Sequence, residues 1–162
     1  MSQFEAIQAA YQTFTNQFQS AVISTVSKNG VPNASYAPFV MDDVKNIYIY
    51  VSGLSTHTQN LNAIPIASVL FIEDESKTQQ IFARRRLNYE CTATVVQTGT
   101  ATWIQIVSDF ESRFGNIIQL IRDLPDFRIF KLTPTAGRFV VGFGAAYDID
   151  ASDLNKLVHV TS

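Results

Sequence analysis

The chain has 162 residues, of which 46% are hydrophobic and 16% charged, so it is long and apolar enough to bury one sizeable core. Twelve Lys and Arg residues oppose fourteen Asp and Glu residues, which leaves a net charge of −2. Such a balance gives no field that attracts nucleic acid or an anionic membrane, and neither partner is expected. The single cysteine, Cys91, excludes an internal disulfide and a thiolate-rich zinc site.

The N-terminal residues predict neither a signal peptide nor a membrane anchor. They contain no basic stretch followed by an apolar run, and no segment approaches the roughly 20 apolar residues that a membrane span needs. No repeat, low-complexity tract or Gly/Ser linker divides the chain. A cytoplasmic protein with a single domain over residues 1–162 is therefore expected.

The first predicted element is an amphipathic helix over residues 2–19, because apolar side chains recur there at steps of three and four. Ser2 and Glu5 have the spacing of a capping box, in which each side chain satisfies the other residue's free backbone N–H group. Three strands rich in β-branched and aromatic residues follow, the first two joined by the hairpin turn Asn29-Gly30. They are expected over residues 21–28, 31–40 and 46–52.

The rest of the chain predicts two helical segments and further strands. A short helix is expected from Ser55 and is closed by Pro65, since the residue before a proline disfavours helix. A second helical stripe runs from Trp103 to Ile121 and is interrupted by Gly115. Strands are expected over 67–74, 81–97 (one long strand or a pair), 127–134 and 137–149. The first of these is apolar enough to be buried on both faces.

This order of elements favours a mainly β fold. Few helices separate the strands, whereas a doubly wound parallel sheet alternates strand and helix. The sequence therefore predicts an antiparallel barrel with helices at its ends.

Several common catalytic motifs are absent from the sequence. It has no GxGxxG in a Rossmann context, no GxxxxGK[ST] phosphate loop, no GxSxG elbow and no HExxH. Nothing local supports a Ser-His-Asp triad. The two histidines, His57 and His159, are candidates for a shared metal site, but no short-range carboxylate spacing supports one.

Residues 51–65 form the most informative segment, in which a strand ends and a helix begins among hydroxyl and imidazole side chains. The first turn of a helix leaves N–H groups unpaired and carries the positive end of the helix dipole, so it suits a phosphate. The alternative, which the pattern alone favours, makes Ser55 an N-cap and His57 a surface residue. The polar residues at this point are Ser55, Thr56, His57 and Thr58.

The run Arg84-Arg85-Arg86 is a second candidate site. In a strand, Arg84 and Arg86 share one face and Arg85 points to the other. Guanidinium groups bind phosphate or carboxylate through paired hydrogen bonds, which suits a nucleotide or haem propionates. The alternative is a charged edge strand that discourages aggregation.

Three further residues have a structural interpretation beside a functional one. His159 is either a solvated tail residue or an axial iron ligand, since imidazole commonly ligates haem. Cys91 is interpreted as a small buried strand residue. Trp103 lies on the second helical stripe and is assigned to the core or to a dimer interface.

Several segments carry a family resemblance when they are taken together. They are SYAPFV (35–40), LSTHTQNL (54–61), IPIASVLFIEDE (64–75), IFARRRL (81–87), LPDFRIFKLTPTAGRFVVGFGAAY (124–147) and the tail. In combination they resemble the haem-utilisation (HugZ/HutZ-type) branch of the pyridoxamine 5'-phosphate oxidase-like split barrels. The similarity covers nearly the whole chain, from about Gln17 onward.

This resemblance implies a six-stranded split β-barrel that acts as a homodimer, with ligand sites at the subunit interface. The matching strand and helix start hold FMN in flavin-binding relatives. The oxidase branch has basic residues where this chain has Ser35, Thr56 and His57, which removes much of the positive charge that a phosphate dianion requires. By position, the flavin-side residues are Ser35, Tyr36, Ala37 and Pro38, and the phosphate-side residues are Ser55, Thr56, His57 and Thr58.

Haem-degrading relatives imply a second set of site residues. A histidine on the C-terminal tail ligates iron in those proteins, and His159 is the candidate here. Arg84 matches an arginine that lies near the haem. An acidic residue of the other subunit supports the histidine through a hydrogen bond that fixes its orientation. Asp123 is the best match by position, and Asp126 is the second.

The resemblance therefore implies haem binding at the dimer interface, with His159 as the metal ligand. Electrons from a reductant, whose identity the sequence does not give, would allow O₂ to open the macrocycle and release iron. An FMN-dependent oxidoreductase is the alternative enzyme. A non-enzymatic module that stores haem or flavin is the third hypothesis.

Overall fold

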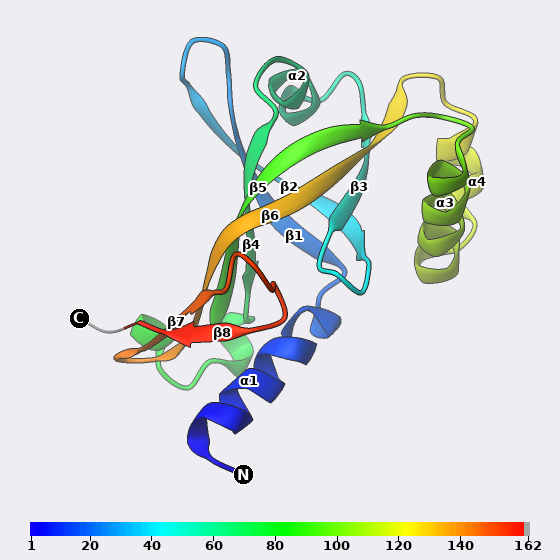
Figure 1. Cartoon of the computed structure of the whole chain (residues 1–162). Helices are drawn as coiled ribbons and strands as arrows, with labels where there is room; N and C mark the ends of the chain where they lie inside the picture. The colour runs from blue at the N-terminus through cyan, green and yellow to red at the C-terminus, as the bar shows by residue number, and fades with distance from the viewer. Residues whose placement is uncertain (161–162) are drawn as a thin grey trace.

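The computed structural model describes residues 1–160, in which six antiparallel strands close into a barrel (Figure 1). Around the barrel the strands follow the order β3, β2, β1, β4, β5 and β6, and β6 pairs back onto β3. This confirms the expected six-stranded antiparallel barrel. The strands are β1 (Ser20–Val26), β2 (Pro32–Met41), β3 (Ile47–Ser52), β4 (Ile66–Ile72), β5 (Arg86–Val96) and β6 (Phe127–Gly142).

The strand β6 is longer than the sequence predicts. The two strands expected over 127–134 and 137–149 are replaced by one 16-residue strand, followed by β7 (Ala145–Ile149). A bulge lets the chain continue, because Cys91 pairs with Pro134 while its neighbour Glu90 pairs with Ala136. The end of β6 pairs with β7, which pairs with β8 (Leu157–His159), so these two strands extend the sheet beyond the barrel.

The helices begin and end close to where the sequence places them. In the confirmed capping box, the Glu5 N–H donates to Ser2 Oγ at 3.1 Å. Gly115, at φ +81°, separates the last two helices. The helices are α1 (Gln3–Thr13), continued by a 3₁₀ turn (Phe14–Gln17), then α2 (Thr56–Ala63), α3 (Ala101–Phe114) and α4 (Ile117–Arg122). Within residues 1–160, every helix is too short or too polar to span a membrane.

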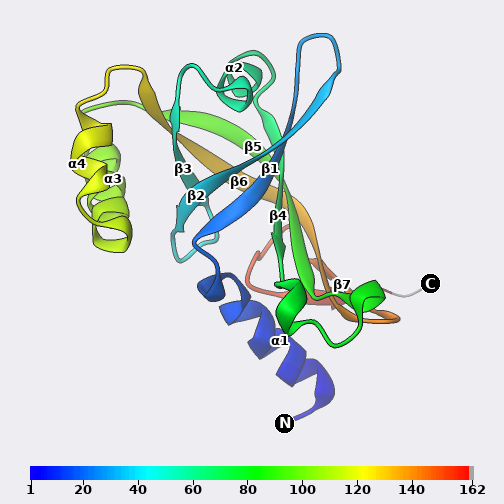
Figure 2. The ribbon, with the colours of Figure 1, turned by 180° about the vertical axis from the view of Figure 1, so that it is seen from behind.

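Strand β3 is buried on both faces and separates two apolar clusters. Ile47, Ile49 and Val51 face the barrel interior. Tyr48 and Tyr50 face outward into a second cluster formed with α3 and α4, which flank the barrel (Figure 2). Trp103 packs against this second cluster and therefore contributes to packing within one chain.

Two sequence predictions about the next strands are wrong. Strand β4 is not buried on both faces, since its side chains alternate and Ile66 on the outside is 49% exposed. The segment expected over 81–97 as one long strand or a pair of strands begins instead with a 3₁₀ turn (Ile81–Ala83), and β5 starts only at Arg86.

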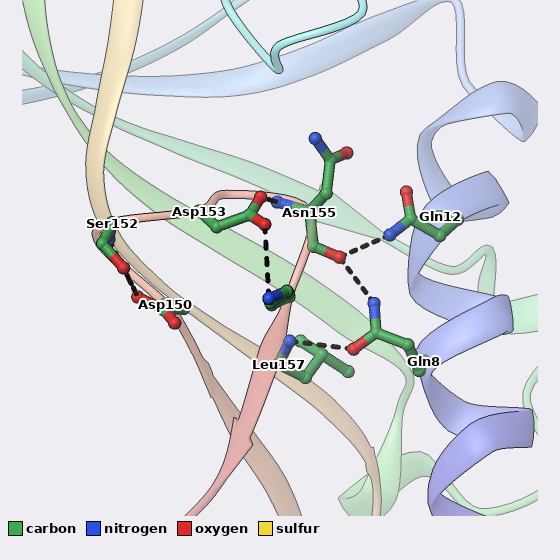
Figure 3. A network of polar contacts seen from close by, with 8 residues as sticks. Gln8, Gln12, Asp150, Ser152, Asp153, Asn155 and Leu157 are labelled. Carbon is green, nitrogen blue, oxygen red and sulfur yellow. Dashed lines mark hydrogen bonds and ion pairs between the residues drawn. The ribbon is translucent and has the colours of Figure 1, made fainter.

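Helix α1 holds the loop between β7 and β8 in place (Figure 3). Gln8 Nε2 donates to the Asn155 carbonyl at 2.6 Å, and the Leu157 N–H donates to Gln8 Oε1 at 2.9 Å. Gln12 also donates to the Asn155 carbonyl. One helix near the start of the chain therefore fixes the strand that carries His159.

A buried pair of tyrosines continues this contact into the barrel. Tyr11 Oη donates to the Leu154 carbonyl at 2.6 Å, so the 2.5 Å contact between the two phenols has Tyr89 as donor. Burial raises the pKa of Tyr11 to about 12, which keeps its proton in place at neutral pH.

We expect Tyr11→Phe to lower the free energy of unfolding by about 1–3 kcal/mol, because it leaves a buried carbonyl and a buried phenol without a partner. Urea denaturation followed by circular dichroism measures the loss. The matched control is Tyr36→Phe, which removes a hydroxyl from a side chain that is 68% exposed. Equal stability of the two variants would contradict the role given to the Tyr11 hydroxyl.

Candidate functional site

The first candidate site lies where α2 covers one end of the barrel. His57 on α2 and Ser35 on β2 are in contact, with 2.9 Å between His57 Nδ1 and Ser35 Oγ. Ser35 Oγ donates its own proton to the Ile23 carbonyl at 3.2 Å, so it accepts one from the imidazole. His57 is thereby held as the neutral tautomer with its proton on Nδ1. The two segments that the resemblance associates with FMN do meet here.

Two polar atoms at this site are buried and have no hydrogen-bond partner among residues 1–160. They are His57 Nε2 and Thr58 Oγ1. Beside them, Asn60 Nδ2 donates to Thr25 Oγ1 at 3.0 Å, so the neighbouring polar pair is satisfied. The Ser55 side chain makes no capping hydrogen bond, although Ser55 occupies the N-cap position. The site can therefore donate hydrogen bonds through hydroxyls and accept one at His57 Nε2.

The charge at this site does not suit a phosphate dianion. Burial lowers the pKa of His57, so the imidazole stays neutral at pH 7. Neither 35–40 nor 54–61 contains a lysine or an arginine. The segments that match the flavin site thus offer hydrogen bonds to a phosphate but no compensating charge.

Strand β2 also separates the four expected flavin-side residues. Ala37 is buried inside the barrel, and Ser35 shares its inward face. Tyr36 and Pro38 point to the outside, where both are exposed. The four side chains therefore point to two opposite faces of β2.

A different environment surrounds the arginine run at the opposite end of the barrel. Arg84 precedes β5, so the expectation that it shares a strand face with Arg86 is wrong. Its Nε donates to the Glu73 carbonyl, and Nη1 lies 3.6 Å from Glu75 Oε1. Arg86 Nη1 donates to the Arg84 carbonyl at 2.9 Å. Both side chains are engaged within the chain.

His159 lies on β8 and is exposed. It pairs across the sheet with Tyr147, and the centroids of the two rings are 5.0 Å apart. The Phe4 ring of α1 also contacts Tyr147, with 6.0 Å between the ring centroids. The His159 imidazole makes no hydrogen bond or ion pair with residues 1–160, so its nitrogens are available to a ligand.

The sequence-predicted residues therefore fall into separate regions. Helix α2 and strand β8 lie at opposite ends of the barrel (Figures 1 and 2), so His57 and His159 do not share a site within one chain. Residues 1–160 contain no cluster of three or more side chains suited to a metal ion. Asp123 is an exposed residue at the C-terminus of α4, on the flank of the barrel. Ser52 Oγ donates a hydrogen bond to the Asp126 carboxylate at 2.8 Å, and the Gly53 N–H donates to the Asp126 backbone carbonyl.

Sequence reasoning missed a hollow of about 410 Å³ on the outer face of β1, β4 and β5. Ser24, Ile66 and Thr92 line it, and the nearby Val22 is 39% exposed. In the sequence, the one indication of this face is the alternation of side chains along the strands, which turns Val22 and Ile66 outward. Such a face is suited to contact with another surface.

Comparison with known proteins gives this architecture a family. Residues 7–141 match the family model described as pyridoxamine 5'-phosphate oxidase. The chain belongs to this family. It is 37% identical over 147 residues to the heme oxygenase HutZ of Vibrio cholerae. The aligned residues make up 91% of this chain and 83% of HutZ.

Solved structures place the chain within the same branch of the family. A crystal structure of Vibrio cholerae HutZ, described there as a heme storage protein, has a TM-score of 0.74 and 34% identity. That match covers 78% of this chain and 88% of the HutZ chain. Campylobacter jejuni ChuZ has a TM-score of 0.86 and 36% identity, over 99% of this chain but only 64% of its own. The chain is thus a split-barrel relative of HutZ and ChuZ.

We expect His57 to make stability depend on pH. Because burial lowers its pKa below the ordinary 6.5, the unfolded chain takes up a proton before the folded protein does as the pH falls. Neutral His57 therefore adds to the free energy of unfolding above pH 6.5, the pKa in the unfolded chain. This contribution is lost as the pH falls through 6.5 toward the lower pKa of His57 in the folded protein. Urea denaturation at about pH 7.5 and about pH 5.5 measures the loss, which should shrink in His57→Gln. An unchanged pH dependence in the variant would contradict this assignment.

Proposed function

We propose that this protein binds haem at a homodimer interface and degrades it with O₂ and an external reductant, releasing iron. The observation that carries the proposal is the 37% identity to heme oxygenase HutZ over 91% of the chain. Bound haem would supply the iron at which O₂ is reduced and the porphyrin ring that is opened. The protein would supply ligation, orientation and shielding from water.

The residues at the β8 end fit such a ligand. His159 offers an imidazole with no competing partner among residues 1–160, and its ring packs against Tyr147. Helix α1 fixes β8 through Gln8, which limits the directions that the imidazole can take. In this proposal His159 ligates the iron, and Asp123 of a second subunit accepts a hydrogen bond from the other ring nitrogen.

A matched pair of titrations tests the iron ligand. We expect hemin to saturate the wild type at about one per subunit with a shift of the Soret band, and His159→Ala to lose that shift. Added imidazole should restore it in the variant. Val158→Ala, on the same exposed strand, controls for disturbance of β8. An unaltered Soret band in His159→Ala would remove His159 from the mechanism.

Storage without degradation is the second candidate, because HutZ itself is described both as a heme oxygenase and as a heme storage protein. The hemin complex, incubated with ascorbate in air, separates the two functions. Loss of the Soret band with release of iron that ferrozine detects supports degradation. A stable Soret band over the same period, with hemin fully bound, would leave storage as the function.

An FMN-dependent oxidoreductase is the third candidate, and the match to the oxidase family model over residues 7–141 favours it. The polar cluster around His57 is the part of the chain that would receive the flavin phosphate. Because that cluster lacks positive charge, we expect purified protein without flavin bands and no stoichiometric uptake of FMN. Saturable flavin uptake by the folded protein would reverse the preference for haem.

The homodimer is proposed to use the outer face of β1, β4 and β5. The hollow on that face and the half-exposed Ile66 support this choice. We expect light scattering to give twice the mass of one chain, and Ile66→Arg to give a monomer because it adds a charge to the interface. The matched control is Ile104→Arg on α3, where the isoleucine is 60% exposed. A dimer that survives Ile66→Arg would place the interface elsewhere.

A further inference from the structure

A second hollow of about 410 Å³ lies beside the turn between β6 and β7. It is bordered on one side by the loop that precedes β5, which contributes Lys77 and Arg85. Gly142 and Phe143 of the β6–β7 turn border the other side. Phe143 is 73% exposed, so an apolar ring stands at the rim of a pocket with two cationic side chains.

These two cations are unengaged. Unlike Arg84 and Arg86, whose guanidinium groups bind carbonyls or a carboxylate of the chain, Arg85 makes no side-chain hydrogen bond or ion pair with residues 1–160. The Lys77 ammonium has no such partner within the same residues. An arginine whose side chain is only partly exposed and lacks an acceptor leaves its fork of N–H groups free for a ligand.

The charge of the hollow is positive. Glu73 is its acidic side chain among residues 1–160, and one of its carboxylate oxygens lies 3.3 Å from Thr78 Oγ1, which also donates to the Asp74 carbonyl at 2.9 Å. Two cations against one carboxylate leave a net charge of about +1. The amides of Gln79 and Gln80 complete a lining that is suited to hydrogen bonding with an anion.

The hollow lies next to the strand that carries His159. Gly142 pairs with Ala145 across the β6–β7 turn. The next residue, Ala146, accepts a hydrogen bond from the Val160 N–H at 3.3 Å. The imidazole and the cations therefore belong to the same end of the barrel, where Phe82, at 83% exposure, adds further apolar surface.

We propose that Arg85, assisted by Lys77, binds the carboxylate groups of an amphipathic ligand, and that these are the propionates of the tetrapyrrole in the function proposed above, on which this inference rests. The guanidinium fork pairs with a carboxylate through two hydrogen bonds, and the ammonium adds a point charge. The aromatic side chains contact the apolar macrocycle. Of the three consecutive arginines, Arg85 rather than Arg84 is thus the ligand-binding residue.

Metal-free protoporphyrin IX separates this role from that of the iron ligand, because it carries the same propionates and needs no axial histidine. We expect Arg85→Ala to weaken its binding by roughly tenfold or more, since a charge-assisted pair is lost. Lys77→Ala should weaken it less, and Arg85→Lys should give an intermediate value. Fluorescence titration measures all three. His159→Ala should bind protoporphyrin IX as the wild type does.

Two controls make the readout specific. Arg138→Ala removes an arginine of β6 that is already paired with Asp148 at 2.9 Å, and it should leave porphyrin affinity unchanged. The dimethyl ester of protoporphyrin IX, in which both propionates are blocked, should bind the wild type and Arg85→Ala equally. The hemin complex of Arg85→Ala should keep the wild-type Soret position.

The outcomes separate the two proposals. If the wild type binds porphyrin but Arg85→Ala binds the free acid equally well, this inference is wrong and the haem function stands. The same conclusion follows if Arg85→Ala weakens binding of the ester as much as that of the acid. If the wild type binds neither hemin nor protoporphyrin IX, the haem function fails and this inference fails with it.

Discussion

The length of β6 is the constraint on which the rest of the structure depends. Its first six residues pair with β3 and close the barrel, while its last residues run past the barrel and pair with β7. The bulge at Thr135 allows β6 to pair with both β3 and β7. Thr135 is left without a partner on β5, so the strand bends while the residues on either side of it stay paired with β5. A shorter strand would close the barrel but would leave β8 and His159 with no sheet to join. Gly137 keeps this bend close-packed, since a Cβ there would lie 2.7 Å from the Asn88 carbonyl oxygen.

The barrel that β6 closes has two chemically different ends. At the α2 end, buried hydroxyls and a neutral imidazole form a polar cluster without fixed charge. At the other end, β8 carries an exposed imidazole, and a hollow beside the β6–β7 turn is lined by two cations and an exposed aromatic ring. The split-barrel fold is thus retained, the two segments that match the flavin site carry no lysine or arginine, and two cationic side chains line a hollow at the other end. This contrast is the physical reason to prefer haem over flavin.

Local signals made much of the fold predictable. The capping box at Ser2 and Glu5 acts within one helical turn, and Pro65 limits α2 through the residue next to it. The sequence predicts two strands, over 127–134 and 137–149, where the structure has the long β6, because the bulge that joins them at Thr135 depends on pairing with the distant strand β5. The 3₁₀ turn before β5 keeps Arg84 out of the strand, so the expected alternation of the three arginines, with Arg84 and Arg86 on one face, does not form. The contact between Gln8 and Asn155 joins residues 147 positions apart through a backbone carbonyl, so no sequence pattern signals it.

The exposure of His159, the proposed iron ligand, bears on the choice between storage and degradation. Within residues 1–160 no element covers His159, so a single chain would hold its ligand open to water. Degradation requires that solvent be kept from the reacting centre, whereas simple binding does not. A second subunit is the available cover, and it is also the source proposed for Asp123, which lies on the flank of its own barrel. In the proposed homodimer, such a cover would convert an exposed binding surface into the enclosed site that degradation requires.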